Sequence, residues 1–163
     1  MKQPLVSVIM GIYNTAKSLP DSIESILNQT YKNWELIMCD DCSTDNTFEV
    51  ANFYAEKYSN IKVIKNEKNM RLAYSLNQCL KEAKGEYIAR MDADDISMPF
   101  RFEKQVEFLN DNPEFMCVGS TIIPFDENGE KKRKKNKRKT CCTRYEAWCN
   151  FFSPNNYDEK ARI

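Results

Sequence analysis

The pattern of apolar and polar positions along the chain predicts short buried strands that alternate with amphipathic helices. Five short apolar runs, bounded by glycine, proline or polar residues, predict strands at residues 5–10, 34–39, 61–64, 87–89 and 115–119. Apolar positions at helical spacing predict helices at 19–29, 45–58, 72–83 and 102–109, the first two capped by Ser18 and by Ser43 or Thr44. Strands that alternate with helices imply an α/β fold, with a mostly parallel sheet and right-handed crossovers.

Length and composition fit one folded unit. The chain has 163 residues, of which 42% are hydrophobic, so it can bury a core of useful size. It contains no run of eighteen apolar residues, and its N-terminus lacks the features of a signal peptide. We therefore expect a cytoplasmic protein.

The net charge of zero conceals two regions of opposite charge. Residues 1–130 hold 13 Lys and Arg against 21 Asp and Glu, a net charge of −8, and we expect them to form the folded domain. Residues 131–163 hold 11 Lys and Arg against 3 Asp and Glu, a net charge of +8, and we expect a poorly ordered basic tail.

The run KKRKKNKRK at residues 131–139 is the most basic part of this tail. It is either a solvated segment with no partner or a surface for anionic groups. If it binds anionic groups, we expect peripheral contact with the inner face of a membrane, and we expect no nucleic-acid partner.

The seven cysteines and the absence of histidine limit the available chemistry. Cys39, Cys79 and Cys117 lie in apolar patterns and are predicted to be core residues, while Cys39 and Cys42 also have the C-x-x-C spacing of a redox pair. Without histidine, neither a Ser-His-Asp triad nor a histidine-containing zinc site can form.

Polar side chains follow the predicted strands at positions where a parallel sheet binds its ligands. The candidate residues that share this placement are Gly11, Tyr13, Asn14, Asp41, Arg71, Asp92 and Asp94. Tyr13 can stack on a planar ring, Asp41 can accept a hydrogen bond from a base or ribose, and Asp94 can bind a metal that bridges two phosphates. Together they predict a site for a nucleoside diphosphate with Mg²⁺ or Mn²⁺.

Each candidate also has a purely structural interpretation. The carboxylates of 92–95 can form a solvated acidic loop, and Asp40 and Asp41 can cap the following helix. Tyr13 can simply cover the sheet edge, and Arg71 can be a solvated loop charge. The conjunction of polar groups at three strand ends favours the binding site.

Residues 4–120 resemble the nucleotide-binding half of a family 2 glycosyltransferase of the inverting GT-A type. The resemblance rests on VSVIMGIYN at 6–14, SIESILNQTYKNWELIMCDDCSTDNT at 22–47 and LNQCLKEAKGEYIARMDADDISMPFRFEKQ at 76–105. It implies a Rossmann-like sheet with helices on both faces, a D-x-D motif at residues 92–94 whose Asp94 holds the metal, and Asp41 and Tyr13 against the base. It also implies a nucleotide-sugar donor, expected to be UDP-linked, and a glycan or lipid-linked acceptor.

The sequence departs from the family pattern at several positions. Proline is usual where Gly11 stands, and glycine where Cys42 and Arg71 stand, which matters if these turns need a positive φ. No catalytic base is identified after Gly129. Two hypotheses therefore remain: an inverting transferase, or a truncated chain that binds the nucleotide without transferring a sugar.

Overall fold

The computed structural model describes residues 3–121 and 123, and the backbone of the short strands at 125–126, 129–130, 141–142 and 151–152. The principal elements follow the predicted alternation, and they are β1 (Val6–Ile12), α1 (Leu19–Leu27), β2 (Trp34–Asp40), α2 (Thr47–Lys57), β3 (Ile61–Lys65), α3 (Leu72–Glu82), β4 (Tyr87–Arg90) and α4 (Arg101–Asp111). The short strands that follow are β5 (Cys117–Val118), β6 (Phe125–Asp126), β7 (Gly129–Glu130), β8 (Cys141–Cys142) and β9 (Phe151–Phe152).

The central sheet has the order β3-β2-β1-β4-β9-β5-β8. Strands β1 to β4 are parallel to one another, and Val6 of β1 is aligned with Trp34 of β2 and with Tyr87 of β4. The carboxyl ends of β1, β2 and β4 therefore lie side by side at one edge of the sheet, as the sequence predicts.

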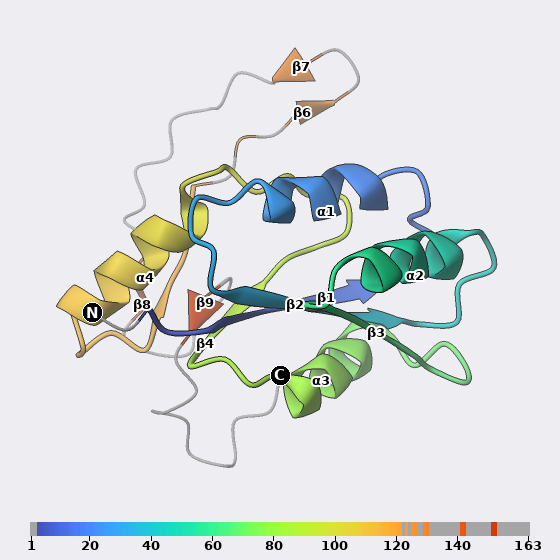
Figure 1. The fold of residues 1–163 in the computed structure, drawn as a ribbon, viewed down its shortest axis with the longest axis horizontal. Helices are drawn as coiled ribbons and strands as arrows, with labels where there is room; N and C mark the ends of the chain where they lie inside the picture. Colours follow the sequence, from blue (N-terminus) through green and yellow to red (C-terminus); the bar gives the residue numbers. More distant parts are fainter. Residues whose placement is uncertain are drawn as a thin grey trace.

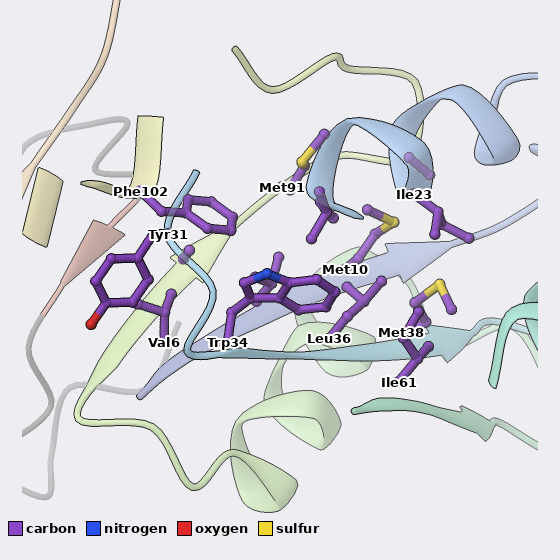
Figure 2. Packing of buried hydrophobic residues seen from close by; sticks show 14 of the residues in the cluster. Val6, Met10, Ile23, Tyr31, Trp34, Leu36, Met38, Ile61, Met91 and Phe102 are labelled. Carbon is purple, nitrogen blue, oxygen red and sulfur yellow. The ribbon is translucent and has the colours of Figure 1, made fainter. Parts of the chain in front are cut away.

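Helices cover both faces of this sheet, with α1, α2 and α4 on one face and α3 on the other (Figure 1). Alternate residues of β1 separate accordingly: Val6, Val8 and Met10 join the larger cluster, and Ile9 joins the cluster under α3. Figure 2 shows the larger cluster, where Met10, Leu36 and Met38 of the sheet lie beneath Ile23 of α1. Both faces are buried, which explains why the strands read as continuous apolar runs.

The N-cap predicted for α1 agrees with the structure, and the caps predicted for α2 do not. Ser18 occupies the N-cap of α1, but its hydroxyl makes no capping hydrogen bond within that helix. Helix α2 begins at Thr47 with Asn46 as N-cap, so the predicted caps Ser43 and Thr44 are wrong. The Asp45 carboxylate accepts a hydrogen bond from the Thr47 N–H at 3.0 Å, which satisfies a free donor at the helix start.

The far side of the sheet also differs from the simple alternation. The predicted fifth strand is short, and it pairs antiparallel with β8 and β9 rather than with β4. Strand β9 lies between β4 and β5, antiparallel to both. The basic run at 131–139, predicted to be poorly ordered, lies outside the described residues.

Candidate nucleotide-binding site

A pocket of about 260 Å³ opens at the carboxyl edge of the sheet. Four of the seven candidate residues line it: Gly11, Tyr13, Asp41 and Arg71. The remaining wall was not predicted from the sequence, and it comes from Ile12, Asn69, Leu72 and Ser75. The structure thus brings together groups from β1, β2 and the start of α3.

Asp41 is the buried anchor of this pocket, with 4% of its surface exposed. One carboxylate oxygen accepts hydrogen bonds from the Asn66 side-chain amide and the Met70 N–H, both at 2.7 Å. The other oxygen accepts from the Arg71 N–H at 2.7 Å. The carboxylate therefore fixes the loop between β3 and α3, and the interpretation of Asp41 as a cap of α2 is wrong.

Asp40 points elsewhere and does not cap α2 either. Its carboxylate accepts a hydrogen bond from the Ser43 N–H at 3.2 Å, and Lys65 lies 4.0 Å away. The side chain is fully buried, so its role is to hold the turn after β2.

Arg71 adopts a backbone conformation that suits glycine. Its φ of 73° and ψ of 161° fall in a region that is essentially restricted to glycine. Cys42 also has a positive φ, 63°, as expected for a position where the family pattern has glycine. Arg71 stands directly before α3 and is exposed, so its guanidinium can reach a ligand in the pocket.

Tyr13 and Asn14, at the end of β1, have different surroundings. Tyr13 is 45% exposed and forms part of the pocket wall. The Asn14 side-chain oxygen accepts hydrogen bonds from the N–H of Thr44 at 2.8 Å and from its hydroxyl at 3.2 Å. Asn14 therefore braces the loops after β1 and β2, and it lies outside the described pocket wall.

The three carboxylates after β4 also differ in their surroundings. Asp92 forms an ion pair with Arg90 at 3.1 Å. Burial raises the pKa of Asp95, and the charges of Asp92 and Asp94 raise it further. Asp94 is exposed, and no hydrogen bond or ion pair of its carboxylate occurs among the described residues.

Arg101 supplies positive charge beneath these carboxylates. Burial lowers the pKa of its guanidinium to about 10, and the neighbouring Asp95 and Asp92 oppose that shift. Its side chain donates a hydrogen bond to the Arg90 carbonyl at 2.9 Å, so it ties the start of α4 to the end of β4.

The donor set is suited to one mode of metal binding. Within the described part of the chain, no group of three acidic or cysteine side chains could enclose a metal ion. An exposed carboxylate such as Asp94 can instead supply one oxygen to a Mg²⁺ or Mn²⁺ ion that takes its other ligands from phosphates and water. The residues present fit a metal of that kind.

The cysteines have structural surroundings. Cys39 and Cys79 are buried as predicted, and a hydrogen bond from Cys79 lowers the pKa of the Cys39 thiol. Cys39 is therefore partnered with Cys79 across the α3 face rather than with Cys42. Cys117 was also predicted to be a core residue, but it is only half-buried, and it is disulfide-bonded.

No helix among the described residues has the length and apolar character needed to cross a bilayer.

Comparison with known proteins identifies one family. Its model, described as glycosyl transferase family 2, matches residues 7–161. EpsE of Bacillus subtilis, which bears the name of a glycosyltransferase, is 58% identical over 127 residues, covering 77% of this chain and 46% of its own length. The Escherichia coli enzyme UDP-Glc:alpha-D-GlcNAc-diphosphoundecaprenol beta-1,3-glucosyltransferase WfgD is 44% identical over 125 residues, covering 76% of this chain and 48% of its own. The chain spans about half the length of these curated relatives.

Solved structures support the same relationship. The mannosyltransferase PcManGT from Pyrobaculum calidifontis, in complex with GDP-Man and Mn²⁺, has a TM-score of 0.68 and 27% identity over 74% of this chain and 36% of its own. TarS from S. aureus, in complex with UDP, has a TM-score of 0.66 and 25% identity over 82% of this chain and 39% of its own. The expected GT-A architecture, with helices on both faces of a mostly parallel sheet, is confirmed.

Proposed function

The chain belongs to glycosyl transferase family 2, and on that basis we propose that it is the donor-binding half of an inverting, metal-dependent glycosyltransferase. The proposed donor is a nucleotide-diphosphate sugar, UDP-linked, and the proposed acceptor is a glycan or a lipid-linked glycan. The observation that carries the proposal is a base-sized pocket at the ends of β1 and β2, with the exposed carboxylate of Asp94 at the same edge of the sheet.

The pocket supports recognition of the nucleotide. Tyr13 offers an exposed ring on which a base can stack. Asp41 offers carboxylate oxygens that are already fixed in the pocket wall, and Gly11 allows close approach of the ligand. Arg71 brings a positive charge for the phosphates, and Asn14 acts by holding the Tyr13 loop in place.

The aspartates after β4 support binding of the diphosphate. Asp94 would hold a Mg²⁺ or Mn²⁺ ion, which when bound stabilises negative charge on the departing diphosphate. Asp92 is paired with Arg90, so its negative charge is partly compensated and it competes less with Asp94 for the metal. In the proposed arrangement, Asp92 faces the donor side of the loop. PcManGT was solved with GDP-Man and Mn²⁺, which supports a divalent metal bound together with a nucleotide sugar.

The acceptor side of the reaction needs a base that deprotonates the acceptor hydroxyl as it attacks the anomeric carbon. The described residues offer no candidate that we assign to this role. The name of WfgD gives it a diphosphoundecaprenol-linked acceptor, which supports a lipid-linked acceptor for this chain as well. Residues 131–139 would then provide peripheral contact with the inner face of the membrane, through their eight basic side chains.

Calorimetric titration with UDP tests the donor site. We expect UDP to bind more tightly in Mn²⁺ than in EDTA, and we expect Asp94→Ala to abolish that gain while leaving the weaker binding in EDTA intact. Binding that is absent in both media would overturn the proposal. If UDP binds but no glycan forms from a UDP-sugar, the chain is a binding-only protein, which is the alternative hypothesis.

A further inference from the structure

One face of helix α1 is polar although it is buried. Its members have the spacing i, i+4, i+7 and i+11, and they run from the N-cap Ser18 through Ser22 and Ser25 of the helix to Gln29, just beyond its last residue. Ser22 and Gln29 are exposed by 1% and 0%. Buried polar side chains on a helix need partners, and we call these four residues the α1 polar face.

Most of their partners outside α1 lie in residues 91–100, which we call the aspartate loop because it carries the three carboxylates between β4 and α4. The Ser22 hydroxyl is shared between the carbonyls of Ala93 and Asp95, each at 2.8 Å. The Ser18 hydroxyl lies 3.1 Å from the same Ala93 carbonyl. The two peptide carbonyls on either side of Asp94 are therefore both attached to α1.

The other two residues of the α1 polar face, Ser25 and Gln29, form hydrogen bonds with the rest of the aspartate loop and with the start of α4. Ser25 accepts a hydrogen bond from the Ser97 N–H at 3.0 Å. The Gln29 side-chain amide donates to the Met98 carbonyl at 2.9 Å, and its oxygen accepts from the Phe102 N–H at 3.2 Å. The loop is thus bonded to one helix along most of its length.

The chemistry of these contacts leaves the metal-binding group available. Three adjacent carboxylates repel one another, so the loop needs an external restraint to stay compact. Arg90 and Arg101 supply positive charge to Asp92 and Asp95, whereas a cation paired with Asp94 would compete with a metal for that carboxylate. Neutral hydroxyl groups bonded to the backbone fix the loop without occupying the carboxylate of Asp94.

We propose that Ser22, assisted by Ser18, is a positioning residue that sets the backbone on both sides of Asp94 for metal–diphosphate binding. This inference rests on the proposed donor function. It assigns to Ser22 no contact with the nucleotide, because the hydroxyl is used entirely within the protein. Its loss should therefore affect the metal-dependent part of binding and spare the part that depends on the base pocket.

The experiment measures the ratio of UDP affinities in Mn²⁺ and in EDTA, by calorimetry on the whole chain. We expect Ser22→Ala to reduce this ratio about tenfold, the effect of losing one buried hydrogen bond at the metal site, with little change in EDTA. Ser18→Ala removes the weaker of the two contacts from a half-buried position, and a smaller reduction is expected. This second variant decides the question if Ser22→Ala does not fold.

Ser7→Ala is the matched control. Ser7 is fully buried in β1, and its hydroxyl accepts a hydrogen bond from the Gly85 N–H at 2.7 Å, at the opposite edge of the sheet. A general loss of stability should appear in this variant without a change in the ratio. An unchanged ratio in Ser22→Ala and Ser18→Ala, or an equal fall in Ser7→Ala, would overturn the inference. A wild-type chain whose affinity gains nothing from Mn²⁺ would overturn the proposed donor site itself.

Discussion

The carboxylate of Asp41, just after β2, accepts a 2.7 Å hydrogen bond from the backbone N–H of Arg71, the residue before α3. The contact joins positions 30 residues apart and holds Arg71 at a φ of 73°. A strained conformation persists only where neighbouring interactions impose it, and such positions cluster at ligand sites. The pocket is therefore built around a buried acid that restrains a strained loop.

Replacing Asp41 tests this restraint. In Asp41→Asn, one acceptor becomes an NH₂ group that faces at least one of the three donors from Asn66, Met70 and Arg71. We expect the free energy of unfolding to fall by about 2 kcal/mol, with weaker UDP binding, as measured by urea denaturation and calorimetry. Asp21→Asn, at an exposed position of α1, is the control and should cost less than about 1 kcal/mol.

Two substitutions at Arg71 separate backbone strain from charge. Arg71→Gly relieves the strain and should raise the free energy of unfolding by about 1 kcal/mol, while Arg71→Ala keeps the strain and should not. Both remove the guanidinium from the pocket, so both should weaken UDP binding to a similar extent. Equal stability of the two variants would contradict the assignment of strain to this residue.

Glycine substitutions distinguish a rigid contact from a flexible one. A Cβ at Gly85 would lie 2.5 Å from the Ser7 nitrogen and 2.7 Å from the Leu5 carbonyl oxygen, and neither backbone atom can move freely. Gly85→Ala should therefore cost about 3 kcal/mol.

A Cβ at Gly11 would instead meet the end of the Leu72 side chain, at 2.7 Å. Leu72 can rotate, so Gly11→Ala should cost less than about 1 kcal/mol. The displaced side chain borders the pocket, and UDP affinity should fall. Thermal denaturation and calorimetry on the two variants test the contrast, which fails if Gly11→Ala is the more destabilising.

Much of the fold could be predicted from local pattern. The short apolar run at 5–10, bounded by Pro4 and Gly11, predicted a buried strand, and Ile23 and Ile26 predicted the side of α1 that meets the sheet. The placement of aspartates directly after β2 and β4 predicted the edge of the sheet at which they lie.

The interactions that shape the site were not predictable in the same way. The three donors to Asp41 lie 25 to 30 residues further along the chain, and the contacts of Ser22 lie 71 and 73 residues away. Ser22, Ser25 and Gln29 did give a signal, a polar stripe on an apolar helix, but such a stripe normally faces solvent. Strand β9 has two residues, too few to show a period.

The pH dependence of the free energy of unfolding tests the burial of Tyr31 in the core. Tyr31 is 6% exposed and donates a hydrogen bond to the Pro4 carbonyl. Burial raises its pKa to about 12, and Tyr87 and Glu86 add to the shift. Unfolded tyrosine ionises near pH 10, so the stabilisation is complete below about pH 10 and is lost as the pH rises toward about 12.

The wild-type chain should therefore lose about 2 kcal/mol more than Tyr31→Phe between about pH 9 and about pH 12, as measured by urea denaturation. Tyr74→Phe, at an exposed tyrosine of α3, is the control and should retain the wild-type dependence. Parallel curves for wild type and Tyr31→Phe would contradict the assignment.

The central claim is that Asp94 holds the metal of a metal–diphosphate site while the base lies in the pocket of Asp41 and Tyr13. The most direct measurement is a crystal structure of the chain with UDP and Mn²⁺, with the metal located by its anomalous scattering. We expect a manganese peak within coordination distance of the Asp94 carboxylate and of the diphosphate, with the uracil ring against Tyr13. A UDP molecule bound elsewhere, or manganese bound without contact to Asp94, would contradict the account.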